Sequence, residues 1–160
     1  SIARRSRTMI INDDKEAGVV PEMSSQISPT GCGGSLQGMN ILIAEDDWLL
    51  ADTLAVLLEE QGARIVGPSP ETRRATALME SAQVDFALVD MNLRDGFSDE
   101  LIEKLRDRQI PFAIVTAYHS LPTNAGEHAV MTLHKPLDHR VLFNLLQKYT
   151  RGPSPLSRDR

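Results

Sequence analysis

The segment Met39-Asn40-Ile41-Leu42-Ile43-Ala44 runs directly into Glu45-Asp46-Asp47, and this stretch decides how the rest of the chain is interpreted. Residues 39–44 form a short, nearly continuous apolar run, which is typical of a strand buried on both faces of a parallel sheet. The three carboxylates follow at the point where such a strand would end. The segment therefore predicts a buried strand with an acidic group at its carboxyl end.

Beyond this segment, apolar runs alternate with helical patterns along the chain. Further strands are expected at 63–67, 84–89, 111–115 and 130–134, and helices at 47–61, 69–82, 98–108 and 138–149. Gly62 is expected to end the first helix, and Ser69, Ser98 and Asp138 are expected to cap the later ones. Five strands alternating with helices predict an α/β fold with a doubly wound parallel sheet.

The expected folded domain covers residues 39–149, between two tails. Residues 1–38 are rich in Ser, Gly, Pro and Asp and are predicted to form a disordered arm, and residues 150–160 a flexible tail. Within the domain, residues 117–129 contain Pro122 and Gly126 and lack an apolar period. A loop or a short irregular turn is therefore expected where a fourth helix would otherwise stand.

Composition and charge exclude several classes of function. The chain has 160 residues with 41% hydrophobic and 24% charged side chains, which suits one globular domain. Its single cysteine, Cys32, allows no intrachain disulfide and argues against a cysteine metal cluster. The net charge is −5, with ten basic and seventeen acidic residues between 39 and 149, so direct nucleic-acid binding is not expected. Without a long apolar run or a signal-peptide pattern, we expect a cytoplasmic location and no membrane contact.

Polar side chains follow four of the five expected strands. These residues are Glu45, Asp46 and Asp47 after the first strand, Asp90 and Asn92 after the third, Thr116 after the fourth and Lys135 after the fifth. Because ligands of open α/β sheets bind at the carboxyl ends of the strands, we expect these side chains to form one site.

The expected site suits phosphoryl transfer. Clustered carboxylates repel one another unless a cation is present, and oxygen ligands without His or Cys favour a hard ion such as Mg²⁺. Asp90 can then act as the nucleophile and become an acyl phosphate. The Lys135 ammonium can neutralise the phosphoryl charge, and the Thr116 hydroxyl can donate to a phosphoryl oxygen.

The motifs Ile41-Leu42-Ile43-Ala44-Glu45-Asp46-Asp47, Asp90, Thr116-Ala117 and Lys135-Pro136, in this order, resemble the receiver domains of response regulators in two-component signalling. The resemblance covers about 39–149 and implies a flavodoxin-like (CheY-like) fold with strand order 2-1-3-4-5. It also implies a role for each matched residue: Asp46 and Asp47 as the Mg²⁺-binding acidic pair, Asp90 as phosphoacceptor and metal ligand, Asn92 as a backbone-carbonyl ligand, Thr116 as the switch hydroxyl and Lys135 as the phosphate-binding lysine.

The resemblance implies partners as well. The phosphoryl donor would be a phosphohistidine on a histidine kinase or a phosphotransfer protein. The domain would not be an enzyme beyond Mg²⁺-dependent self-phosphorylation and self-dephosphorylation. Because only eleven residues follow 149, we expect a single-domain regulator whose face 117–149 contacts a downstream protein, unless the chain was cut from a longer one. A homodimer is possible.

Two positions depart from the usual receiver pattern. Thr132 stands where the family has an aromatic residue, and Leu137 stands where Phe is common. The segment from Pro111 to Tyr118 instead resembles stand-alone alphaproteobacterial regulators with a Phe-Ala-Thr-Gly-type fourth strand, although Ala117 replaces the Gly. We therefore expect the conformational change in the loop 117–129, with Tyr118 as its lever.

Several alternatives remain open from the sequence. The domain could be a phosphate sink or shuttle, or a degenerate receiver that binds partners without phosphorylation. A haloacid-dehalogenase-type phosphatase is disfavoured, because that family places its nucleophile on the first strand. Asp46 and Asp47 could simply begin the first helix, since acidic residues favour helix N-termini. Glu45 is interpreted as a charge behind the ligands, and Trp48 is expected to be partly buried beside the acidic site.

Overall fold

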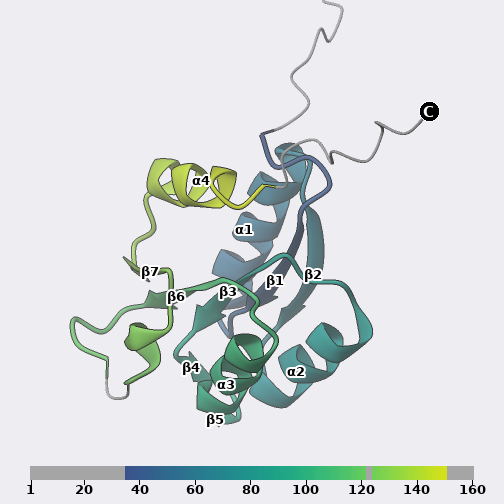
Figure 1. The fold of residues 1–160 in the computed structure, drawn as a ribbon. Coiled ribbons are helices and arrows are strands. Elements are labelled where there is room, and N and C mark those ends of the chain that lie inside the picture. Colours follow the sequence, from purple (N-terminus) through teal and green to yellow (C-terminus); the bar gives the residue numbers. More distant parts are fainter. Residues whose placement is uncertain (1–34, 122–123, 151–160) are drawn as a thin grey trace, which may run out of the picture. The chain divides into compact units, whose positions relative to one another are not determined.

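The fold is a parallel sheet covered by helices on both faces (Figure 1). The computed structural model describes residues 35–121 and 124–150. The sheet has the order β2-β1-β3-β6-β7, which is the predicted order 2-1-3-4-5 when its five strands are counted along the chain. Its strands are β1 (Asn40–Ala44), β2 (Arg64–Ser69), β3 (Phe86–Asp90), β6 (Phe112–Thr116) and β7 (Met131–His134).

The segments that follow the strands supply the two helical layers. The helices are α1 (Trp48–Glu60), α2 (Thr72–Ser81), α3 (Asp99–Asp107) and α4 (His139–Gln147), with a short 3-10 helix, η1 (Asn124–Glu127), between β6 and β7. Residues 117–129 were expected to lack a full fourth helix, and η1 is the regular element found in their described part. A two-stranded hairpin, β4 (Asn92–Leu93) with β5 (Gly96–Phe97), was not predicted.

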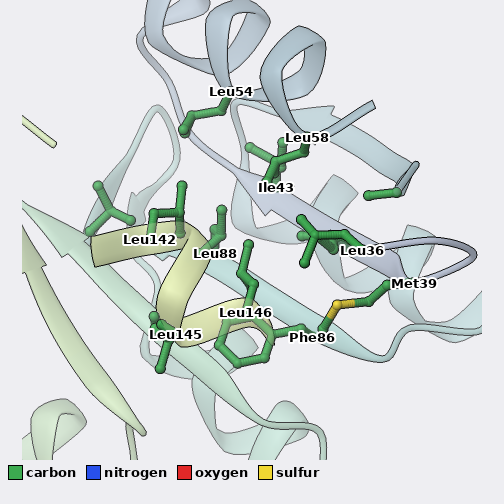
Figure 2. Close-up of a cluster of buried hydrophobic side chains, with 14 of the residues drawn as sticks. Leu36, Met39, Ile43, Leu54, Leu58, Phe86, Leu88, Leu142, Leu145 and Leu146 are labelled. Atoms are coloured by element: carbon green, nitrogen blue, oxygen red, sulfur yellow. The ribbon is translucent and has the colours of Figure 1, made fainter. Parts of the chain in front are cut away.

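Alternate residues of the central strands enter two separate cores. Ile41 and Ile43 of β1 join the cluster on the α1 and α4 side, together with Phe86 and Leu88 of β3 (Figure 2). Leu42 of β1 belongs to the second cluster, with buried side chains of α2 and α3. Every residue of β3 and β6 is buried, because both faces of these strands are covered.

The folded part begins before the predicted boundary at residue 39. Leu36 is fully buried in the first cluster, and its N–H donates to the Gln61 carbonyl at 3.0 Å. Gly38 makes a similar bond to the Gly62 carbonyl at 2.9 Å. Residues 35–38, expected in a disordered arm, therefore belong to the domain. Residues 1–34 and 151–160 lie outside the described residues, and the predictions about them stay predictions.

The helix ends test four local predictions. Gly62 lies just past α1 with φ +89°, and the Asp138 carboxylate caps α4 by accepting the Arg140 N–H at 2.9 Å, both as predicted. Ser98 holds the N-cap position of α3, but its hydroxyl makes no hydrogen bond within the described part of the chain. The prediction for Ser69 is wrong. Ser69 still belongs to β2, because it pairs with Ala44, and α2 begins only at Thr72.

Among the described helices, none combines the length and the apolar character needed to cross a bilayer.

Replacing Leu36 by Ala should lower the free energy of unfolding by about 2–5 kcal/mol, because a buried Leu leaves a cavity when it is truncated. Urea unfolding followed by circular dichroism measures the change. The matched control is Val56→Ala on α1, whose side chain is 48% exposed and should cost much less. Equal stability of the Leu36 variant and the wild type would place residue 36 outside the folded unit.

Candidate functional site

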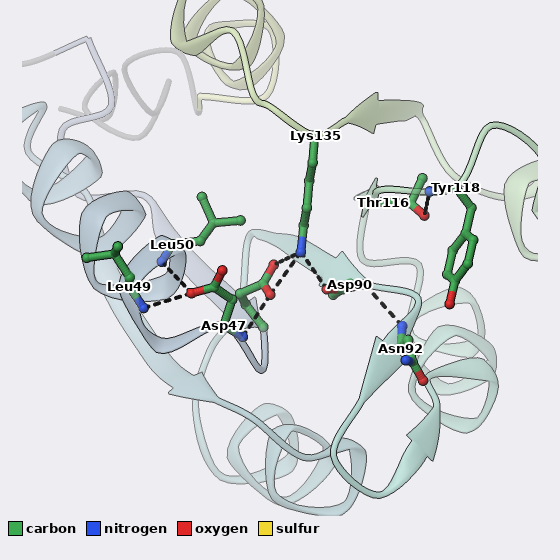
Figure 3. A network of polar contacts seen from close by, with 9 residues as sticks. Asp47, Leu49, Leu50, Asp90, Asn92, Thr116, Tyr118 and Lys135 are labelled. Atoms are coloured by element: carbon green, nitrogen blue, oxygen red, sulfur yellow. Dashed lines mark hydrogen bonds and ion pairs between the residues drawn. The ribbon is translucent and has the colours of Figure 1, made fainter.

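The polar residues singled out from the sequence meet at the carboxyl edge of the sheet (Figure 3). Glu45 follows β1, Asp90 ends β3 and Thr116 ends β6, while Lys135 follows β7. Because these strands are parallel and adjacent, their ends lie side by side.

Lys135 holds two buried carboxylates together at the centre of the site. Its Nζ lies 2.7 Å from Asp90 Oδ2 and 2.9 Å from Glu45 Oε2. The Glu45 and Asp90 residues are only 3% and 6% exposed, whereas the Lys135 side chain is 22% exposed. Such a cation between two carboxylates compensates much of the cost of burying them.

Burial and ion pairing shift the protonation of this group. Burial raises the pKa of Glu45 from its ordinary value of 4.5 to about 7, although the hydrogen bond from Lys135 opposes this rise. Burial acts to lower the pKa of Lys135, but its bonds to Asp90 and Glu45 outweigh that effect and raise the pKa. Lys135 therefore stays protonated near neutral pH.

Three carboxylates could hold a cation. Glu45, Asp46 and Asp90 each offer an oxygen, and these oxygens all lie within 4.8 Å of one another. Asp46 is half-buried, so the group opens towards solvent on its side. An all-oxygen donor set with room for water fits Mg²⁺, which retains part of its hydration shell in proteins.

Asp47 lies apart from this cluster and caps a helix instead. Its Oδ1 accepts the N–H groups of Leu49 at 3.0 Å and Leu50 at 3.2 Å, at the start of α1. The Asp47 N–H itself donates to Glu45 Oε1 at 3.0 Å. The structure thus groups Asp46 and Asp90 with Glu45 and not with Asp47. The position of Glu45 directly after the apolar run was the sequence signal for this arrangement.

The Asp90 carboxylate is also fixed from the loop that follows it. The Asn92 N–H donates to Asp90 Oδ1 at 3.1 Å, while Lys135 holds Oδ2. Asn92 begins the hairpin β4–β5, so its backbone is held in a regular pairing next to the acceptor. Its role as a carbonyl ligand stays a prediction.

Thr116 presents a buried hydroxyl that is already engaged. Its Oγ1 accepts the backbone N–H of Tyr118 at 3.0 Å, and the residue is fully buried. Tyr118 is 48% exposed, and Thr132, at the position of the usual aromatic, is half-buried in β7 opposite Ile114. The hydroxyl group thus connects the end of β6 to the first residues of the loop 117–129.

Trp48 was expected to be partly buried, and this prediction is wrong because its residue is 73% exposed. As the first residue of α1, it projects beside a hollow of about 400 Å³. Asp46, Pro70 and Arg94 line the same hollow. The tryptophan therefore borders the acidic site from the solvent side.

A doubly wound parallel sheet with buried carboxylates and a lysine at its carboxyl edge defines a class of α/β domain that binds ligands at that edge. The family model described as "Response regulator receiver domain" matches residues 41–147, and the chain belongs to this family. It is thus a signalling domain of the two-component type.

Two curated relatives illustrate the extent of the similarity. The chain is 33% identical over 92 residues to the transcriptional regulatory protein PdtaR of Mycobacterium tuberculosis, covering 56% of this chain and 44% of PdtaR. It therefore spans less than half the length of that relative. It is also 31% identical over 126 residues to an uncharacterized 14.6 kDa protein of Leptolyngbya boryana, covering 72% of this chain and 92% of that protein.

Solved structures agree on the fold. A CheY-like receiver domain protein from Methanospirillum hungatei is 26% identical with a TM-score of 0.64, covering 70% of this chain and 93% of the other. The response regulator TrrA of Thermotoga maritima, solved in complex with Mg(2+)-BeF, is 19% identical with a TM-score of 0.62, covering 69% and 98%. The second likeness concerns the fold alone.

The raised pKa of Glu45 makes the stability of the metal-free protein depend on pH. Below pH 4.5 this carboxyl is protonated in both states, but between pH 4.5 and about 7 only the folded state keeps the proton. The stability that the group contributes therefore falls as pH rises across this window and is fully lost above about pH 7. Glu45→Gln should remove this dependence, because glutamine does not titrate. The stability of the variant relative to the wild type should therefore rise from pH 5 to pH 8. Urea unfolding in EDTA at both pH values measures it, and a constant difference between the two proteins would contradict the assignment.

Proposed function

We propose that the chain accepts a phosphoryl group on Asp90 from a phosphohistidine of a histidine kinase or phosphotransfer protein, and that this reaction requires Mg²⁺ and switches protein–protein contacts. The main support is the buried Asp90 carboxylate, which lies 2.7 Å from Lys135 inside a cluster of oxygen ligands. Receiver domains as a family are phosphorylated on an aspartate, and the family match includes Asp90.

The residues of the site suit the individual parts of the transfer. One Asp90 oxygen attacks phosphorus, its P–O bond forms as the donor's P–N bond breaks, and the donor imidazole keeps the electron pair. Lys135 then neutralises a phosphoryl oxygen, and the Thr116 hydroxyl still has its proton to donate. The clustered carboxylates would hold a Mg²⁺ ion, which would neutralise the remaining charge.

We propose Glu45, Asp46 and Asp90 as the carboxylate ligands, with the Asn92 carbonyl as a further ligand. Three carboxylate oxygens within 4.8 Å support this set. Asp47 is left out because its Oδ1 already accepts the N–H groups of Leu49 and Leu50 at the start of α1, and because the residue is exposed.

We further propose that output runs through the loop 117–129 and the face 117–149, as in a stand-alone regulator of the alphaproteobacterial subgroup. The Tyr118 N–H on the Thr116 hydroxyl supports this route. A phosphoryl oxygen that draws the hydroxyl towards Asp90 would weaken that bond and free the start of the loop. A downstream protein or a second copy of the chain could then recognise the change, in the cytoplasm.

Incubation with acetyl phosphate and Mg²⁺ should add the mass of one phosphoryl group, measured by intact-mass spectrometry. The gain should disappear in Asp90→Ala and in EDTA, while the exposed-site control Asp107→Ala keeps it. If neither acetyl phosphate nor a panel of histidine kinases phosphorylates the wild type, the domain is a degenerate receiver. A very short acyl-phosphate lifetime would instead favour the phosphate sink.

Two neighbouring alanine variants separate metal binding from helix capping. Asp47→Ala should cost about 1 kcal/mol of stability through the lost cap and keep its Mg²⁺ affinity. Asp46→Ala should lose most Mg²⁺ affinity without that cost in stability. Trp48 is the single tryptophan of the sequence and borders the site, so its fluorescence can follow Mg²⁺ titrations. The opposite pattern would restore Asp47 as the ligand.

A further inference from the structure

A side chain of the loop between β3 and α3 binds the start of α2, which lies more than twenty positions earlier in the sequence. Asp95 Oδ1 accepts the Thr72 N–H at 2.7 Å, and Oδ2 accepts the Arg73 N–H at 3.0 Å. Next to it, the Arg94 N–H donates to the Pro70 carbonyl at 2.9 Å. Three hydrogen bonds therefore tie residues 94–95 to the junction of β2 and α2.

These bonds satisfy a need that α2 does not meet by itself. Glu71 holds its N-cap position with an extended backbone but makes no side-chain cap. The first N–H groups of a helix have no partner within the helix and carry partial positive charge, which favours a carboxylate. Although burial opposes ionisation of Asp95, the Arg73 and Thr72 N–H groups lower its pKa.

The same loop carries parts of the phosphoacceptor site at its other end. Asn92, whose N–H donates to Asp90 Oδ1, pairs with Phe97 in the hairpin β4–β5. The Ser98 N–H donates to the Met91 carbonyl at 3.1 Å, which closes the loop on itself. Asp95 lies in the turn of this hairpin, between Leu93 and Gly96, so its position fixes how the hairpin stands against α2.

Arg94 connects the turn to the cation side of the site. It lines the hollow of about 400 Å³ together with Asp46 and Trp48. Because the Arg94 backbone is bonded to Pro70 and its neighbour Asp95 to α2, the wall of this hollow depends on the same attachment.

We propose that Asp95 is a positioning residue of the phosphoacceptor site, which holds the hairpin that carries Asn92 against α2 and thereby sets Mg²⁺ affinity and phosphoryl acceptance. This inference rests on the proposed function, which supplies the Mg²⁺ ion and the phosphoryl group that the site would bind. Asp95 itself touches none of the three clustered carboxylates, which include the acceptor Asp90, in the contacts described.

The first comparison uses Asp95→Ala with Asp85→Ala as its matched control. Asp85 also binds a backbone N–H of another element, that of Asn40 at 2.9 Å, but it precedes β3 and so lies at the opposite end of the sheet from Asp90. Both variants should lose stability in urea unfolding. Only Asp95→Ala should weaken Mg²⁺ binding, by about tenfold, as removal of a residue that orients metal ligands typically does.

A second variant separates positioning from simple helix capping. In Asp95→Ala/Glu71→Ser, the serine at the N-cap position can cap α2 locally and restore stability. The hairpin still lacks its attachment, so Mg²⁺ affinity and the rate of phosphorylation by acetyl phosphate should stay low. If Mg²⁺ affinity and the phosphorylation rate recovered together with stability, the proposal would be overturned and Asp95 would be only a helix cap. Wild-type Mg²⁺ affinity in Asp95→Ala would also overturn it.

A metal-free measurement keeps this test independent of the proposed function. Hydrogen exchange of the Asn92 amide, bonded to Asp90 Oδ1, reports the hairpin position directly in EDTA. Exchange should be faster in Asp95→Ala and in the double variant, and unchanged in Asp85→Ala. Unchanged exchange in Asp95→Ala would overturn the positioning role. A wild type that takes up no phosphoryl group would refute the proposed function and leave this comparison valid.

Discussion

The ammonium group of Lys135 between Asp90 and Glu45 is the interaction on which the site depends. Lys135 lies 90 positions after Glu45 and 45 positions after Asp90 in the sequence. The three residues stand at the ends of three different strands. Two carboxylates at this depth would repel each other and lose hydration, and the lysine compensates both costs. The parallel sheet brings the three groups to one edge, and the ion pairs fix where each side chain points.

Much of this arrangement could be predicted, because in a parallel sheet the end of each strand locates a functional side chain. The buried strands β1, β3 and β6 stand out as apolar runs, and the residue after each run falls at the edge where the site forms. The alternation of strands and helices then leaves few topologies, since parallel crossovers share one hand. The fold and the meeting of Asp90 with Lys135 both follow from this pattern.

The remaining details depend on side-chain contacts that the sequence pattern does not encode. Two adjacent aspartates look equivalent in sequence, yet the start of α1 at Trp48 makes Asp47 a helix cap and leaves Glu45 to join the cluster. Likewise, the sequence gives no sign of the role of Asp95, because its partners Thr72 and Arg73 lie more than twenty positions earlier. Asp47 and Asp95 both accept N–H groups at the start of a helix, where those groups have no carbonyl partner within the helix.

The burial of Leu36 bears on how this domain could be transplanted. The family match begins at residue 41, whereas the side chains that close the core start five positions earlier, with Met39 between them. A module excised at the family boundary for fusion to another protein would therefore carry an open core at the amino ends of its strands. A junction at Ser35 would keep the buried side chains of Leu36 and Met39. It would also keep the two backbone hydrogen bonds that residues 36 and 38 make to the end of α1.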